Sequence, residues 1–103
     1  GFFMIELNSK QRKFLEKEAH DLSPLVIIGG AGLSDGVIDM VDNSLFHHEL
    51  IKVKFNEYKD EKFDLTNEIC EKTNATLVRV IGNVAILYRP AEEVEKRRYP
   101  QVV

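Results

Sequence analysis

The sequence predicts one α/β domain, of α+β layout, in which helices pack on a four-stranded mixed sheet. Three observations predict it. The 103 residues suffice for one modest core. Apolar runs of strand length alternate with segments of helical periodicity, which gives the order α-β-α-β-α-β-β. The dipeptide Gly82-Asn83 between the last two runs is a strong hairpin signal. Helical crossovers favour a parallel first pair of strands, and the hairpin adds an antiparallel pair.

The first helix is expected to be capped by Ser9 and to end near His20. At about 100° per residue its core side holds Phe14, Leu15, Ala19 and Leu22. The other side carries four basic or titratable side chains within an arc of about 80°, namely Lys10, Lys13, Lys17 and His20. This basic stripe is either a binding surface or an ordinary solvated face, since Glu16 and Glu18 flank it.

A short buried strand is predicted over Leu25–Ile28, and the glycine-rich turn 29–36 follows it. Ser34 is expected to cap a second helix that runs to about His48, with its core side formed by Val37, Ile38, Val41 and Leu45. A strand, a glycine turn and a helix N-terminus direct free backbone N–H groups toward one place, which suits a phosphate. The alternative is a tight connection between strand and helix.

The second half predicts one more helix and three strands. Leu50–Phe55 alternates, so that Lys52 and Lys54 point away from the core-facing side chains. A helix is expected over Lys62–Thr73, with Leu65 and Ile69 inward together with Phe63 or Cys70, and with Asn74 as a left-handed C-cap. The hairpin strands are Thr76–Ile81 and Val84–Arg89. After Pro90 the chain is charged, and a short helix or a loose tail is expected.

Composition bounds the class of protein. The chain is 44% apolar and 30% charged, as is ordinary for a globular domain, and we find no transmembrane or secretory segment in it. The lone Cys70 allows no intrachain disulfide or cysteine-based zinc site and fits a reducing cytoplasm. Met4 is expected to be the natural start, with residues 1–3 a cloning remnant; residues 4–92 form the domain and 93–103 a charged tail.

Signatures of enzymes are missing. No serine or cysteine nucleophile lies in a known motif, and the glycine turn lacks the lysine and Ser/Thr of a P-loop. The turn does not match G-x-G-x-x-G either. His47, His48 and Glu49 are consecutive, so on a helix they would not converge on a metal, and Cys70 is expected to be a small core residue. No catalytic residue, metal or cofactor is therefore predicted.

The distribution of charge still allows a nucleic-acid ligand. A net charge of −3 counts against a simple nucleic-acid binder. Acidic residues, however, gather between Leu33 and Leu50, where no lysine or arginine occurs. Binding to a phosphate backbone needs exposed N–H groups and several dispersed cations. The sequence offers a glycine turn, a basic helix side, and Lys52 and Lys54 on a strand, with Arg79 or Arg89 as a further cation.

Three segments resemble the CRM domain family, named for chloroplast RNA splicing and ribosome maturation. They are LVIIGGAGLSDGV at 25–37, HHELIKVK at 47–54 and VIGNVAILYRP at 80–90, and Ser9–Arg12 and His20 also fit the first helix of the family. The likeness runs from about Leu7 to Pro90 in order and spacing, and the size is similar to the stand-alone bacterial form, the YhbY type.

This resemblance implies an RNA-binding domain shaped like the C-terminal domain of a bacterial translation initiation factor, and association with precursors of the large ribosomal subunit. It places the GxxG loop of the family on Gly29, Gly30, Ala31 and Gly32, and family basic positions on Lys10, Lys13, Lys52, Lys54 and Arg89. Relatives often carry a polar or basic residue where Gly30 and Ala31 stand, so contact through the backbone is implied here. Asp35 also partly offsets the helix dipole.

The expectation is thus a cytoplasmic, non-enzymatic protein that clamps structured ribosomal RNA and that has ribosomal proteins as further possible partners, with no membrane, small-molecule substrate, cofactor or metal. The candidate RNA-binding residues are Gly29, Gly30, Ala31, Gly32, Lys10, Lys13, Lys17, Lys52, Lys54 and Arg89. The alternative is a module that docks on a ribosomal protein or assembly factor through its acidic second helix. An enzyme acting on nucleotides is disfavoured by the missing catalytic groups.

Overall fold

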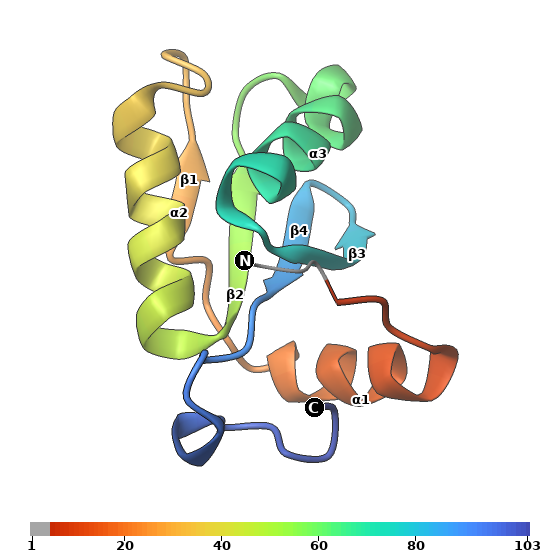
Figure 1. Cartoon of the computed structure of the whole chain (residues 1–103). Helices are drawn as coiled ribbons and strands as arrows, with labels where there is room; N and C mark the ends of the chain where they lie inside the picture. Colours follow the sequence, from red (N-terminus) through yellow and green to blue (C-terminus); the bar gives the residue numbers. More distant parts are fainter. Residues whose placement is uncertain (1–4) are drawn as a thin grey trace.

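The computed structural model describes residues 5–103 and has the predicted order of elements (Figure 1). They are α1 (Ser9–Ala19), β1 (Val26–Ile28), α2 (Asp35–His48), β2 (Leu50–Phe55), α3 (Lys62–Thr73), β3 (Thr76–Ile81) and β4 (Val84–Tyr88), with short 3-10 turns η1 (Lys59–Glu61) and η2 (Val94–Lys96). The expected start at Met4 and the remnant before it lie outside the described residues. Across residues 5–103 no helix has the length and apolar character needed to cross a membrane.

The sheet is mixed, as predicted. Its strand order is β1-β2-β4-β3, with β1 parallel to β2 and the other two pairs antiparallel. The hairpin turn uses Gly82 at φ 59°, and Asn74 ends α3 in the left-handed conformation at φ 61°. Both turns therefore form where the residue types predict them.

The two faces of the sheet are covered unequally (Figure 1). On one face α2 and α3 bury the main core, whose members include Val41, Leu45, Ile69, Cys70, Val53, Phe55 and Leu87. On the other face α1 packs Leu15 and Ala19 against a smaller core of Leu50, Val78, Ile86 and Tyr88. The sequence left open whether Phe63 or Cys70 faces inward. Cys70 does, because it is 3% exposed whereas Phe63 is 57% exposed. Burial raises the pKa of the Cys70 thiol to about 11, so it stays protonated at neutral pH.

Strand β1 is only half buried, which corrects the prediction for Leu25–Ile28. Val26 and Ile28 enter the main core, but Leu25 and Ile27 are 46% and 53% exposed. The reason is that β1 is an edge strand, and the smaller core that α1 forms on the second face includes no residue of β1. Leu22, expected on the core side of the first helix, is 39% exposed because α1 already ends at Ala19, so Leu22 lies in the link to β1.

Asn8, and not Ser9, caps α1. The Asn8 side chain accepts a hydrogen bond from the Gln11 N–H at 2.8 Å, and the Gln11 side chain accepts one from the Asn8 N–H at 2.9 Å. The helix thus begins with a capping box, which two polar side chains spaced three apart can form together and Ser9 cannot. The predicted cap of α2 is confirmed, because Ser34 Oγ accepts from the Val37 N–H at 3.2 Å.

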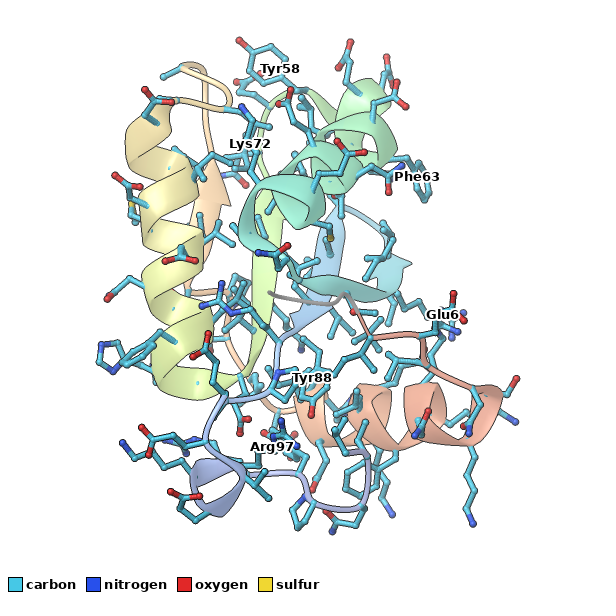
Figure 2. All side chains as sticks on the ribbon, in the orientation of Figure 1. Glu6, Tyr58, Phe63, Lys72, Tyr88 and Arg97 are labelled. Carbon is cyan, nitrogen blue, oxygen red and sulfur yellow. The ribbon has the colours of Figure 1, made fainter. Side chains whose placement is uncertain are left out.

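The C-terminal segment packs on the smaller core, whereas the sequence predicts either a short helix or a loose tail. Val102 is 8% exposed and belongs to the smaller core, and its carbonyl accepts a hydrogen bond from Gln11 Nε2 at 2.9 Å. The ring of Tyr99 lies edge-on to Phe14 and to Tyr88, with centroids 6.4 and 6.2 Å apart. In Figure 2 Tyr88 and Arg97 lie near α1 at the bottom of the view. The segment after residue 90 therefore completes the cover of this face.

Glu49 holds the C-terminal segment in place. It is 2% exposed and has a left-handed backbone, with φ 63°. Its carboxylate accepts the backbone N–H of Ala91 at 2.6 Å and that of Arg98 at 2.5 Å. Hydrogen bonds to a charged acceptor are the stronger kind, so this carboxylate closes the loop between residues 91 and 98.

We expect Glu49→Ala to destabilise the protein by about 2–3 kcal/mol, because two partly buried N–H groups lose a charged acceptor. Urea unfolding measures the loss, and limited trypsin digestion should show faster cleavage after Arg97 and Arg98. Glu93→Ala is the matched control, since Glu93 lies in the same segment but is exposed and pairs only with Lys96 on the surface. Equal stability of the two variants would contradict the role given to Glu49.

Candidate nucleic-acid interface

The turn at Gly29–Gly32 joins the end of β1 to α2 and is open to solvent. The Gly32 N–H donates to the Gly29 carbonyl at 3.0 Å, and Gly32 has φ 68°. A Cβ added at Gly29 or Gly30 would meet nothing within 4 Å. Only Gly32 therefore needs to be glycine for the sake of the fold, and the two preceding glycines leave the backbone accessible.

Tyr58 packs against this turn, a contact that the sequence reasoning missed. Its hydroxyl donates to the Gly30 carbonyl at 2.7 Å, and its ring would lie 3.4 Å from a Cβ on Gly32. Tyr58 has a left-handed backbone, with φ 57°, and Figure 2 shows it at the top of the molecule. Tyr58 thus orders the turn from the loop that follows β2. No local pattern predicts a contact between residues so far apart in the chain.

The surroundings of the turn are acidic. Gly30 and residues 56–61 line a shallow hollow of about 690 Å³. Three carboxylates, Glu57, Asp60 and Glu61, lie in that lining with one lysine, Lys59. Asp35 is exposed in the first turn of α2. The turn can let another backbone approach, but these charges oppose an anion at its edge.

The basic stripe of α1 is exposed as predicted. Lys10, Lys13, Lys17 and His20 are all exposed, and none of the ion pairs formed within residues 5–103 involves them. Figure 1 places α1 and the glycine turn at opposite ends of the molecule. The structure therefore does not bring these two candidate contacts together into one compact site.

The lysines of β2 differ in their surroundings. Because side chains alternate along a strand, Lys52 and Lys54 share the face of Leu50, which α1 covers in part. Lys52 is half-buried, and its Nζ donates to the carbonyls of His20 and Leu22 at 3.1 and 3.0 Å. Lys54 is exposed. Lys54 is thus free to meet a phosphate, whereas Lys52 already secures the chain after α1.

Lys54 stands in a row of residues that crosses the sheet. Its Cα partners are Ile27 on β1 and Val84 on β4, and Val84 in turn pairs with Ile81 on β3. Ile27 and Ile81 are each 53% exposed. This end of the face is open, apolar and carries one cation.

Arg89 and Arg79 are both paired. The Arg89 guanidinium donates to Asp42 Oδ1 at 2.6 Å and to the Thr73 carbonyl at 2.7 Å, and its side chain is 18% exposed. It thereby joins α2 to the end of α3, away from the face that carries the stripe. Arg79 pairs with Glu16 of α1 at 2.7 Å but keeps 61% of its side chain exposed.

The side chains of the segment 47–49 do not point toward one common place. The His47 ring lies edge-on to Phe46 with centroids 5.2 Å apart, and Glu49 turns inward to the C-terminal segment. Within the described part of the chain, no three His, Cys, Asp or Glu side chains gather in a way that could hold a metal ion.

Comparison with known proteins gives consistent matches. Residues 7–89 match the model of the CRS1 / YhbY (CRM) domain family. A Haemophilus influenzae protein named RNA-binding protein is 44% identical over 93 residues, which are 89% of this chain and 94% of that protein. The Bacillus subtilis protein named probable RNA-binding protein YqeI is 32% identical, over 91% of this chain and 99% of that protein. The solution structure of a Staphylococcus aureus protein matches with a TM-score of 0.73 and 35% identity, over 85% of this chain and 93% of that one.

The two glycines of the turn should respond differently to alanine. Gly32→Ala places a Cβ at φ 68° against the Tyr58 ring, so we expect a loss of about 1–2 kcal/mol in the free energy of unfolding. Gly30→Ala, the matched control, has open space around its Cβ and should unfold like the unchanged protein. Urea titration of both variants measures the difference, and equal values would contradict the described geometry of the turn.

Proposed function

The chain belongs to the CRS1/YhbY (CRM) domain family, and from that premise we propose that it is an RNA-binding protein acting in the assembly of the large ribosomal subunit. Two of its relatives carry RNA binding in their names. The single observation that supports a phosphate-backbone contact is the stripe of Lys10, Lys13 and Lys17 on α1, which is exposed and takes part in no ion pair among residues 5–103.

Lys54 extends the proposed contact onto the sheet. It lies on the same face as α1 and is exposed, and Lys52, two residues earlier, bonds the carbonyls of His20 and Leu22 just after α1. The turn Gly29–Gly32 is proposed to approach RNA through its backbone at the other end of the molecule, with Ala31 adding no polar group. Arg89 contributes through the structure that it holds, since its guanidinium is bonded to Asp42 and Thr73.

The proposed role is binding and not catalysis, in the cytoplasm, with ribosomal RNA and precursor large subunits as partners. An RNA that contacts both the α1 stripe and the turn must be extended, because these two features lie at opposite ends of the molecule. A structured ribosomal RNA meets that requirement, whereas a mononucleotide does not.

A second candidate function is docking on a ribosomal protein or assembly factor through α2. Phe46 is 74% exposed on this helix, and Asp35 and Asp39 lie on the same side at helical spacing. An association with precursor particles that survives RNase treatment would favour this function over direct RNA binding.

The electrostatic contact is tested by the salt dependence of binding to large-subunit ribosomal RNA fragments. Each neutralised phosphate should contribute about −0.7 to −0.9 to the slope of log K against log salt. Lys13→Ala with Lys17→Ala should make the slope shallower by about 1.4 to 1.8, which corresponds to two lost phosphate contacts. The matched control, Lys72→Ala with Lys96→Ala, removes the same charge from exposed lysines elsewhere and should leave the slope unchanged. A flat salt dependence of the unchanged protein would refute the contact.

The role of the turn is tested at Gly30, where a side chain fits without a clash. Gly30→Asp should weaken binding to the same RNA fragments several-fold, because it adds negative charge where the backbone is to approach, while the melting temperature stays near that of the unchanged protein. Gly30→Ala is the control and should bind with little loss. If Gly30→Asp binds as tightly as Gly30→Ala, the turn is only a connection.

A further inference from the structure

A groove of about 250 Å³ lies where the link from α1 to β1 meets the C-terminal segment. Its walls are mainly apolar and include Leu22, Leu25, Leu50 and Tyr99. Pockets for drug-sized ligands have volumes of about 300–1,000 Å³, so this groove suits a smaller group such as one flat ring system. Arg98 and Tyr99 lie beyond residues 7–89, the part that matches the family model.

The polar residues of the groove suit a nucleotide. Ser23, His48 and Arg98 belong to its lining, and no lining residue is an aspartate or a glutamate. Arg98 donates one N–H to the His47 carbonyl at 3.1 Å and takes part in none of the ion pairs within residues 5–103. This composition contrasts with the hollow beside Tyr58, which three carboxylates line.

Tyr99 can act as a hydrogen-bond donor at this site. Burial raises the pKa of its hydroxyl, the charge of Glu18 raises it further, and Arg98 lowers it. The hydroxyl therefore stays protonated at neutral pH. A tyrosine ring with an intact hydroxyl offers both an apolar surface and a donor to a base.

The groove continues from the basic stripe. The stripe ends at His20, the exposed Asp21 follows, and Leu22 and Ser23 then form one wall of the groove. Lys52 bonds the carbonyls of His20 and Leu22, so this wall is anchored to β2. A strand whose phosphates follow α1 would thus reach the groove directly.

We propose that this groove holds one unpaired base of an RNA whose phosphates lie along Lys10, Lys13 and Lys17. The inference rests on the proposed RNA-binding function and adds to it a place where a base, and not only the backbone, is bound. Burial between leucine side chains and Tyr99 supplies the apolar contact, and Ser23, His48 and Arg98 supply polar groups for the base edge or its phosphate.

Leu25→Asn tests the proposal against a closely matched control. Leu25, just before β1, is 46% exposed and lines the groove, whereas Ile27, two residues further along, is 53% exposed and is not a lining residue of the groove. For an RNA stem-loop, Leu25→Asn should weaken binding roughly fivefold to tenfold, and Ile27→Asn should bind as the unchanged protein does. For a perfect duplex of equal length, neither variant should change the affinity.

A second variant approaches the groove from the other wall. Ser23→Phe fills it from an exposed position and should give the same loss for the stem-loop, even if Leu25→Asn folds poorly. Equal weakening by Leu25→Asn and Ile27→Asn would overturn the groove in favour of a general contact with the sheet. Unchanged binding by both Leu25→Asn and Ser23→Phe would also overturn it.

Ultraviolet crosslinking to the stem-loop gives an independent readout. Mass spectrometry should find a crosslinked nucleotide on Tyr99, because an aromatic side chain in contact with a base is well placed to react. Crosslinks on Tyr58 without any on Tyr99 would overturn the proposal while leaving RNA binding intact. If the unchanged protein binds no RNA at low salt, the proposed function itself fails, and the groove fails with it.

Discussion

The hydrogen bonds of the buried residue Glu49 connect the parts of the structure on which the candidate interface depends. Its backbone N–H donates to the Leu45 carbonyl at the end of α2, and its carbonyl accepts from Arg89 after β4, each at 2.8 Å. Its carboxylate holds Ala91 and Arg98. One left-handed residue therefore connects a helix end, the last strand and the C-terminal segment. Because that segment is held, Val102 joins the smaller core and Tyr99 packs against it.

Most cations near the sheet serve the fold, and this makes the few free ones informative. Arg12 donates to the Val78 carbonyl at 2.7 Å and joins α1 to β3, and Lys62 donates to the Gly82 carbonyl at 2.7 Å and steadies the hairpin. In the same way, Lys52 bonds the His20 carbonyl just after α1, and Arg89 bonds the Thr73 carbonyl at the end of α3. Of the exposed lysines that form no ion pair within residues 5–103, three lie together on α1 (Lys10, Lys13 and Lys17) and one is Lys54 on β2, whereas Lys59 and Lys72 lie elsewhere. A protein with a net charge of −3 can thus present a cationic surface, because its charges are unevenly distributed: α2 carries three aspartates and neither lysine nor arginine, whereas Lys10, Lys13 and Lys17 share one side of α1.

Much of the fold could be predicted from local pattern. The limits of α3 and β3, the cap at Ser34, the left-handed Asn74 and the hairpin at Gly82 all follow from neighbours within a few residues, and each is confirmed. The exposed stripe of α1 is equally local, since helical periodicity alone puts its lysines on one side. Membership of the CRM family was also predicted from the segments around the glycine turn and the hairpin, and the family match confirms it.

The sequence by itself therefore determined the elements, their order and the family, because those depend on the periodicity and conformational preferences of nearby residues. Only the tertiary structure decided which cations are free, since Lys52 and Arg89 look like any surface base until their carbonyl and carboxylate partners come together across the chain. It also decided that Leu25 is exposed, that Tyr58 lies on the glycine turn, and that Tyr99 and Leu22 form one groove. Such contacts join residues distant in sequence, and no local preference encodes them.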